Sequence, residues 1–407
     1  MNENKSNYPA QGWVKILFVT AALLLASSLT AFAQDESVPP CPPCEPPVRV
    51  RGTVRNCAGA PIAGVMVNID GDFGSFSALT NSAGVYDVTL PGGSSYTVTP
   101  VPTTGYFFSP QNAGPSNPTF TRYPRDNRSN FDGDCKTDVA VFKASATGLW
   151  ASLNSSNGAI VSYNFGTTGD IATPGDYNAD GKTDYAVFRP SEGRWYIETD
   201  KSTPLLFDVY TFGLSGDIPV PRDYDGDAKT DVAVFRPSDG TWYILGTSTG
   251  FQAHTLSVSD ARLVPGDYDG DNKDDIAVFR PSDGTWHVRR SSDGVVTTFQ
   301  WGVSTDLPVQ ADYDNDGRTD FAVYRDSDQK WYVYGSSIGW TVLGPWGLST
   351  DRLAPGDYSG DRRTDPAVQR PTEGTFYILD NATGGTSKVD NFSSDFPVAA
   401  AYLTPLY

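Results

Sequence analysis

The 407-residue sequence is poor in the residues that enzymes most often use for acid–base, thiol or redox chemistry. It contains two histidines, four cysteines and two methionines. Basic residues are also scarce, since 30 lysines and arginines stand against 48 aspartates and glutamates, for a formal charge of −18. Nucleic acids and anionic membrane surfaces bind clustered lysine and arginine, so the composition argues against both as main partners. An aromatic content of 13% argues equally against a disordered chain.

Long apolar runs are absent except at the N-terminus, where one extends from Ile16 to Ala33. The run follows a weakly basic start (Lys5 and Lys15) and ends in Ala31-Phe32-Ala33, the small-x-small pattern of a signal peptidase site. We predict that residues 1–33 are a signal peptide, which implies a secreted or cell-surface protein with no membrane span after cleavage. An uncleaved anchor is the alternative, because the run is about as long as a bilayer is thick.

Residues 34–47 form a proline-rich linker that contains Cys41-Pro42-Pro43-Cys44. A thioredoxin-like redox role would need a βαβ context, and no such pattern follows. The pair is therefore interpreted as a local or intermolecular disulfide of an oxidising compartment. The other two thiols are Cys57 and Cys135, and the sequence leaves the pairing open.

The segment 48–122 is predicted to be a small all-β domain. Residues 64–69 and 85–90 alternate apolar and polar side chains with period two, which is typical of half-buried strands. The segment resembles the carboxypeptidase regulatory-like (transthyretin-like) β-sandwich at Arg51-Gly52-Thr53-Val54, Pro61-Ile62-Ala63-Gly64-Val65, Asn81-Ser82-Ala83-Gly84-Val85-Tyr86 and Gly105-Tyr106-Phe107-Phe108-Ser109-Pro110. This resemblance implies a non-catalytic spacer or adhesive module.

The rest of the chain, residues 123–407, consists of six copies of one unit. Its Asp-rich loops are 44 to 47 residues apart and begin at Asn130, Asp176, Asp223, Asp267, Asp312 and Asp357. That period is typical of one four-stranded blade of a β-propeller. In every copy except the first a short apolar run precedes the loop. Three predicted strands follow the loop, as at 232–236 and 241–245 for the second and third strands. No segment shows a helical period.

Acidic residues recur at positions one, three, five and nine of each loop, as in Asp223, Asp225, Asp227 and Asp231. Carboxylates this crowded repel one another unless a cation lies between them, and Ca²⁺ takes about six to eight oxygen ligands. Position seven, Lys229 here, would give its backbone carbonyl and leave its side chain in solvent. We predict up to six calcium ions, held by positions one, three, five, seven and nine: Asn130, Asp132, Asp134, Lys136 and Asp138; Asp176, Asn178, Asp180, Lys182 and Asp184; Asp223, Asp225, Asp227, Lys229 and Asp231; Asp267, Asp269, Asp271, Lys273 and Asp275; Asp312, Asp314, Asp316, Arg318 and Asp320; Asp357, Ser359, Asp361, Arg363 and Asp365.

An EF-hand is excluded because it needs flanking helices and a bidentate glutamate at position twelve. That position is valine in every copy: Val141, Val187, Val234, Val278, Val323 and Val368. The repeats, over about residues 126–407, instead resemble the FG-GAP/VCBS family, the integrin-α-type propeller repeats with calcium between the first two strands. The resemblance implies that the alternating aspartates are calcium ligands.

Several loops depart from the pattern. The first has Asn130 at position one and Cys135 at position six, the second has Asn178 at position three, and the sixth has Ser359 and Arg362 at positions three and six. Position six needs a tight turn with positive φ, which suits glycine in the second and fifth loops and asparagine in the fourth better than alanine in the third.

The first loop lacks an apolar run before it, whereas residues 395–402 match the run that precedes the third loop. We predict an all-β fold, a six-bladed β-propeller with C-terminal strand closure preceded by a small β-sandwich, in which 396–402 forms the inner strand of the first blade. Closure would remove exposed sheet edges.

Catalytic motifs are weak. His287 occupies the register of Tyr243, so it is interpreted as a repeat variant, and Gly246–Gly250 matches Gly-x-Ser-x-Gly but lies between two strands. Tryptophans share one register in five copies, which predicts packing between blades, whereas Trp340 is off-register and could form an exposed contact.

The predicted function is that of a secreted calcium-binding β-propeller, which acts as a non-catalytic binding or adhesion protein for an extracellular protein or glycan. Calcium would be structural. A carbohydrate-binding propeller lectin is the alternative, and a polysaccharide-active enzyme is the third possibility.

Overall fold

The computed structural model describes residues 47–400 except for 72–73, 91–94, 104–105, 111–112, 115, 125–128, 201–205 and 393–394. The predicted signal peptide, nearly all of the linker with Cys41 and Cys44, and residues 401–407 therefore lie outside the described residues. The described part is all-β, and its one helix is the 3₁₀ turn η1 (Val398–Ala400). It contains no helix long and apolar enough to cross a membrane.

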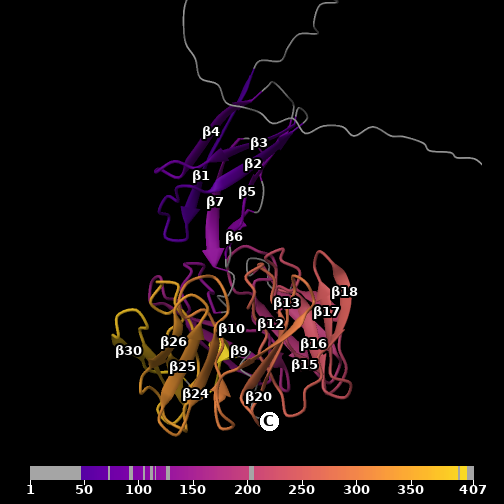
Figure 1. Cartoon of the computed structure of the whole chain (residues 1–407), viewed down its shortest axis with the longest axis vertical. Coiled ribbons are helices and arrows are strands. Elements are labelled where there is room, and N and C mark those ends of the chain that lie inside the picture. Colours follow the sequence, from indigo (N-terminus) through magenta and orange to yellow (C-terminus); the bar gives the residue numbers. More distant parts are fainter. Residues whose placement is uncertain are drawn as a thin grey trace, which may run out of the picture. The chain divides into compact units, whose positions relative to one another are not determined.

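Seven strands between Val48 and Pro124 form two sheets (Figure 1). One has the order β4-β1-β7-β6 and the other β3-β2-β5. Their bounds are β1 (Val48–Asn56), β2 (Met66–Gly71), β3 (Gly74–Leu79), β4 (Val85–Leu90), β5 (Tyr96–Pro100), β6 (Tyr106–Ser109) and β7 (Ser116–Pro124). Both sheets contribute to one core, because residues of β1, β2, β4, β5, β6 and β7 share a single buried cluster.

The alternation predicted for these strands is confirmed. On β2, Val67 and Ile69 are fully buried while their neighbours Met66 and Asn68 are exposed. Successive side chains of a strand point to opposite faces, so alternation of this kind places one face in the core and the other in solvent.

Six four-stranded antiparallel sheets follow between Val139 and Pro397, and we number them first to sixth in chain order. The second strands are β8 (Val139–Lys143), β12 (Tyr185–Arg189), β16 (Val232–Arg236), β20 (Ile276–Arg280), β24 (Phe321–Arg325) and β28 (Ala367–Arg370). The third strands are β9 (Leu149–Leu153), β13 (Arg194–Glu198), β17 (Thr241–Gly246), β21 (Thr285–Arg289), β25 (Lys330–Gly335) and β29 (Thr375–Leu379). The fourth strands are β10 (Ile160–Asn164), β14 (Asp208–Thr211), β18 (Gly250–Thr255), β22 (Val296–Gln300), β26 (Gly339–Leu343) and β30 (Thr386–Val389).

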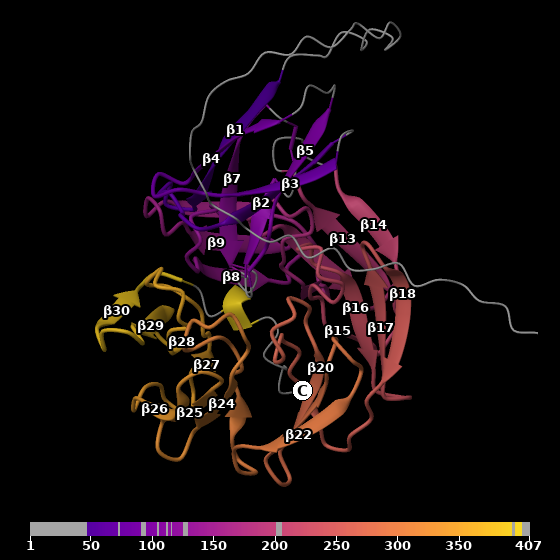
Figure 2. The same cartoon turned by 45° about the horizontal axis from the view of Figure 1, so that its top comes forward.

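The inner strand of each sheet is only two residues long. These strands are β11 (Ile171–Ala172), β15 (Ile218–Pro219), β19 (Arg262–Leu263), β23 (Leu307–Pro308), β27 (Arg352–Leu353) and β31 (Phe396–Pro397). The last of them belongs to the first sheet, since Phe396 pairs with Phe142 and Pro397 with Val141 of β8. The sheets lie around a common centre, as the blades of a β-propeller do (Figure 2).

A large aromatic residue fills the middle of each sheet. Five of them are the tryptophans that share one register, and they are 0–2% exposed: Trp150, Trp195, Trp242, Trp286 and Trp331. Trp242 on β17 packs with Leu263 and Val278 of the next sheet, so the predicted packing between blades is confirmed. Burial of one such side chain contributes about 3 kcal/mol.

A repeated Arg–Asp pair ties the second strand to the segment before the inner strand. In the third sheet Arg236 donates to both carboxylate oxygens of Asp217 at 2.8 Å and lies 4.3 Å from the ring centre of Tyr243. Equivalent pairs are Arg189–Asp170, Arg325–Asp306 and Arg370–Asp351. In the fourth sheet Arg280 pairs instead with Asp283 of the following turn.

Candidate metal centre

Each Asp loop spans nine residues before a second strand, and all but the first follow an inner strand along the chain: 130–138, 176–184, 223–231, 267–275, 312–320 and 357–365. We call them the first to sixth Asp loops. An isolated antiparallel bridge closes five of them, as between Arg222 and Asp231 in the third.

The carboxylate at position one accepts hydrogen bonds from backbone amides of its own loop and so stabilises the turn. In the third loop Asp223 accepts a hydrogen bond from the Gly226 amide at 2.7 Å and another from the Ala228 amide at 2.8 Å. The same two positions, four and six, donate to the carboxylates of Asp267, Asp312 and Asp357. A short acidic side chain that satisfies nearby backbone N–H groups favours a tight turn.

The carboxylate at position nine joins the loop to the rest of its sheet. Asp231 is fully buried, and it accepts from the Tyr224 amide at 2.9 Å and from the Thr247 amide at 2.8 Å. Thr247 begins the turn between the third and fourth strands. The equivalent aspartate makes both contacts in the first, fourth, fifth and sixth loops.

Hydroxyl side chains from that turn reach the carboxylates at positions three and five, which the sequence prediction missed. Thr247 donates to Asp227 at 2.6 Å, and the Ser248 amide donates to Asp225 at 2.7 Å. Ser155, Ser291 and Ser336 donate in the same way to position five of their own loops. A signal was present, since a Ser/Thr pair follows the third strand in four of the six repeats.

The structure brings carboxylates together in three of the six predicted sites. The clusters have oxygens within 4.8 Å of one another and consist of Asp223, Asp225 and Asp231; Asp267, Asp269 and Asp271; and Asp312, Asp314 and Asp316. Among the described residues the first, second and sixth loops form no such cluster. These are the loops in which an amide or a hydroxyl replaces one of the acids.

The fifth loop has a buried carboxylate oxygen without a partner. Asp314 is only 7% exposed, and its Oδ2 accepts from the Ser337 and Ile338 amides at 2.9 and 3.2 Å. Its Oδ1 is buried and has no hydrogen-bond partner. A buried anionic oxygen is costly unless a donor or a cation compensates it, so the loop fits a bound cation.

Burial raises the pKa of several loop carboxylates. The pKa of Asp312 rises to about 7 and that of Asp320 to about 8, in each case chiefly because the carboxylate is removed from water. Burial raises the pKa of Asp231 and Asp267 to about 8 in the same way. A dication in the loop would favour the ionised form of these groups.

The side chains at position seven pack their stems against a neighbouring loop, and Lys182 and Arg318 are exposed as predicted. The Lys273 stem lies against the position-four glycine of the preceding loop, where a Cβ on Gly226 would lie 3.1 Å from Lys273 Cγ. Lys136, Lys182 and Arg318 lie in the same way against Gly360, Gly133 and Gly270. The long side chains therefore pack the loops against one another.

Positive φ occurs at position six as predicted, with 84° at Gly181 and 87° at Gly317. It also occurs at the non-glycine residues Cys135, Ala228, Asn272 and Arg362. Position four has the same conformation, including 61° at Ala179 and 63° at Asn315, and the sequence prediction missed it.

The motifs that suggested catalysis have structural roles. His287 lies opposite Val278 as Tyr243 lies opposite Val234, so its interpretation as a repeat variant is confirmed, and burial lowers its pKa. The Gly246–Gly250 segment is the turn between β17 and β18, whose hydroxyl groups contact the third Asp loop. It does not lead from a strand into a helix.

A groove of about 430 Å³ lies between the fifth and sixth sheets. Val342, Leu343, Pro345 and Trp346 line one side, and Leu379, Asp380, Asn381 and Thr386 line the other. In the third sheet the register of Thr386 is occupied by Phe251, which packs on Phe212 of the sheet before it. The smaller Thr386 leaves this space open.

The loops also bond to one another around the ring of sheets. In every case the carbonyl at position one accepts a hydrogen bond from the position-eight amide of the next loop, at 2.7–2.8 Å. The donors are Thr183, Thr230, Asp274, Thr319, Thr364 and, from the first loop to the sixth, Thr137.

No protein-family model and no curated protein matches the chain. Several solved structures resemble it at low sequence identity. An Agrocybe aegerita lectin that recognises non-reducing terminal N-acetylglucosamine has a TM-score of 0.45 at 14% identity and covers 88% of this chain and 97% of its own. A virginiamycin B lyase from Staphylococcus aureus has a TM-score of 0.41 at 11% identity, with coverage of 62% and 84%. The WD40 domain of Toxoplasma gondii coronin has 0.37 at 13%, with coverage of 64% and 68%. All three TM-scores are below 0.5, and the proteins include a lectin and a lyase.

Proposed function

We propose that this chain is an exported, calcium-stabilised β-propeller of the FG-GAP/VCBS type that acts as a non-catalytic binding or adhesion protein. The propeller has six blades and is closed by the pairing of β31 with β8. Calcium has a structural role, and the ligand is an extracellular protein or glycan.

The observation that carries the calcium hypothesis is the partnerless Oδ1 of Asp314, buried within the cluster of Asp312, Asp314 and Asp316. Oxygen-only donors of this kind suit a hard dication, and calcium tolerates the irregular geometry of a flexible loop. The cation would be held by these carboxylates and would neutralise their mutual repulsion.

Two contacts support closure with six blades. The chain end supplies the inner strand of the first sheet through Phe396 and Pro397. The loop-to-loop hydrogen bonds return to their start when Thr137 of the first loop donates to Asp357 of the sixth. A cation that orders one loop therefore also supports its neighbour.

The non-catalytic role is supported by the engagement of the acids. Loop carboxylates that could act as general acids or bases accept hydrogen bonds from backbone amides of their own loop or of the turn after the third strand, as Asp223 and Asp231 do. A general acid or base must instead reach a substrate proton.

Calorimetric titration of the full chain with Ca²⁺ tests the metal hypothesis. We expect binding at the third, fourth and fifth loops, and Asp314→Asn is expected to remove one site. Asp326→Asn is the control, since Asp326 is an exposed aspartate on a turn of the same sheet. Absence of calcium binding in the unmodified protein, or equal binding in Asp314→Asn, would contradict the hypothesis.

Saccharide binding is a second candidate, favoured by the groove beside Trp346. An indole wall with carboxylate, amide and hydroxyl groups opposite it offers both stacking and hydrogen bonds. Thr386→Phe should place an aromatic ring beside Trp346, as Phe251 of the third sheet, although 63% exposed, lies beside Phe212. On a glycan array, binding that Thr386→Phe abolishes would support this candidate, whereas binding unaffected by the substitution would place the ligand elsewhere.

A further inference from the structure

The first three Asp loops contain three residues, neither glycine nor asparagine, that have a left-handed backbone conformation. They are Cys135 (φ 71°), Ala179 (φ 61°) and Ala228 (φ 69°). Glycine adopts this conformation without strain, and asparagine tolerates it, but alanine and cysteine do so at a cost. In other loops these positions carry glycine or asparagine, such as Gly270 or Asn272, except for Arg362 (φ 75°) in the sixth loop. Strain that persists at specific residues points to a role for their Cβ atoms.

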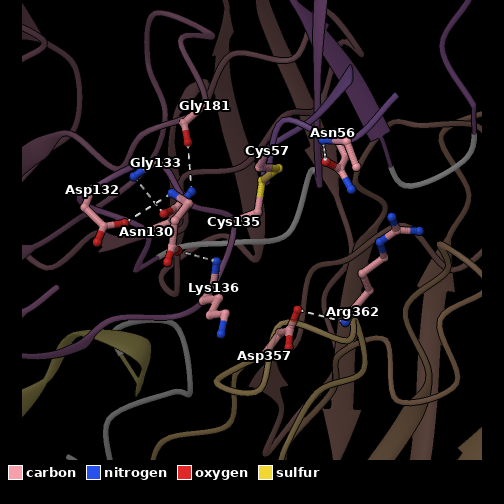
Figure 3. The surroundings of a disulfide bond; sticks show 12 residues. Asn56, Cys57, Asn130, Asp132, Gly133, Cys135, Lys136, Gly181, Asp357 and Arg362 are labelled. Carbon is pink, nitrogen blue, oxygen red and sulfur yellow. Dashed lines mark hydrogen bonds between the residues drawn. A yellow bond between two sulfur atoms is a disulfide. The ribbon is translucent and has the colours of Figure 1, made fainter. Parts of the chain in front are cut away.

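The Cβ of Cys135 carries a disulfide to the domain before the propeller. Its partner is Cys57, which immediately follows strand β1, and the two Cα atoms are 6.0 Å apart (Figure 3). The bond closes a span of 78 residues. It therefore fixes one end of the β-sandwich to position six of the first loop.

The side chains of Ala179 and Ala228 pack against a buried aromatic side chain. Phe107 on β6 is only 4% exposed and packs with these two alanines. Its neighbour Phe108 belongs to the core of the sandwich. Because adjacent strand residues point to opposite faces, β6 uses Phe108 for its own domain and Phe107 for the second and third Asp loops.

The first loop has an amide at position one, where the other five loops have a carboxylate. Asn130, at position one, is 2% exposed; its amide nitrogen donates to the Gly181 carbonyl at 2.9 Å and its oxygen accepts from the Gly133 amide at 2.9 Å. Asp132 and Asp134 accept from the hydroxyls of Ser156 and Ser155. Hydrogen bonds and the disulfide together hold this loop.

We propose that the first three Asp loops form an interaction surface for the chain's own β-sandwich, with Phe107 as the docked side chain and Cys57–Cys135 as a covalent lock. The first loop serves as an attachment point in place of a calcium site. The third loop belongs to this docking surface and also carries a carboxylate cluster, as the fourth and fifth loops do. This proposal does not depend on calcium binding elsewhere.

Hydrogen–deuterium exchange of the full chain in calcium-containing buffer tests the docking of Phe107. Ala228→Gly removes a methyl group that packs against Phe107 and relieves the left-handed strain, so the loop itself should fold. We expect exchange in Tyr106–Ser109 to become about tenfold faster. Asn272→Gly makes the matched change at position six of the fourth loop and should leave Tyr106–Ser109 unchanged.

A second pair of variants separates docking from misfolding. Phe107→Ser should accelerate exchange in Tyr106–Ser109 and in the third loop but leave the fifth loop unchanged, whereas Phe107→Leu should preserve most of the protection. Unchanged exchange in Ala228→Gly and Phe107→Ser would overturn the docking surface. Peptide mapping without reductant should recover Cys57 joined to Cys135, and recovery of either cysteine as a free thiol would overturn the lock.

Discussion

The aspartates of a single Asp loop have different structural roles. Positions one and nine accept backbone hydrogen bonds and so shape the loop, as Asp223 and Asp231 show. Positions three and five accept hydrogen bonds from amides and hydroxyls of the turn after the third strand, and one oxygen of Asp314 keeps no partner. A loop shaped by its own backbone before a cation arrives loses little conformational entropy on binding.

These two roles predict different effects for two substitutions in the fifth loop: one should lower stability without calcium, and the other should lower the stabilisation by calcium. Asp320→Ala removes the acceptor of the Tyr313 and Ser336 amides and should destabilise the protein by about 3 kcal/mol even in chelator. Asp316→Ala should change stability in chelator by less than about 0.5 kcal/mol, yet should reduce the stabilisation by calcium. Urea unfolding with and without calcium measures both, and equal behaviour of the two variants would contradict these two roles.

The raised pKa values predict how stability depends on pH when calcium is removed. Burial raises the pKa of Asp312 to about 7 and that of Asp320 to about 8, whereas an unfolded aspartate titrates near pH 4. The folded state then binds protons more tightly than the unfolded state, so this stability is present below about pH 4 and lost as pH rises through about 7 to 8.

The corresponding measurement is thermal unfolding in chelator at pH 5 and at pH 8.5. We expect the lower melting temperature at pH 8.5 and expect added calcium to abolish most of the difference, because the cation favours the ionised carboxylates. A melting temperature that rises with pH in chelator would contradict this expectation.

In four of the six sheets an Arg–Asp pair stabilises the sheet in addition to its backbone hydrogen bonds. The Asp217 side chain is 2% exposed and that of Arg236 is 21% exposed. Asp217→Asn should therefore destabilise the protein by about 2 kcal/mol, since it leaves a partly buried guanidinium without its carboxylate. Asp283→Asn is the control, because its pair with Arg280 lies on an exposed turn and should matter far less. Chemical denaturation compares the two, and equal losses would contradict the role of burial.

The strands that the sequence predicted are those with a strong local signal. Alternation at Val67 and Ile69 and the recurring tryptophans identified buried faces that the structure has. Inner strands of two residues leave almost no local pattern, so their extent was overestimated at 396–402, where β31 ends at Pro397 and η1 follows.

The candidate site could be predicted only in part, because some of its contacts leave no local pattern in the sequence. Its aspartates follow a regular spacing, and the loops with a substituted acid are those without a cluster. The turn hydroxyls come from another part of each repeat, and the Cys57–Cys135 bond joins residues far apart in the chain. Such contacts depend on tertiary structure and have no fixed spacing along the chain.

At the scale of the whole molecule, the short C-terminal segment contributes to the stability of the ring of sheets. Val398 is fully buried in the cluster that contains Trp150, and Phe396 pairs with β8. Removal of residues 395–407 should destabilise the protein by about 3 kcal/mol or more, because it opens a sheet edge and exposes this core. Differential scanning calorimetry measures the loss, and an unchanged melting temperature would contradict closure through β31.

Much of the negative charge of the chain lies in the Asp loops. The carboxylates gather in loops that bond to one another around the sheets. Cations bound there would reduce the repulsion within each loop and stabilise the folded chain, since they bind the native state in preference to the unfolded one.

The most direct measurement is thermal unfolding of the full chain in chelator and in a calcium series, with magnesium as the control. Each occupied site adds about 2.7 kcal/mol when calcium is at about 100 times its dissociation constant. For three sites we predict a rise in melting temperature on the order of 10 °C, with a much smaller rise in magnesium. Identical melting temperatures in calcium and in chelator would contradict the claim that the Asp loops hold structural calcium.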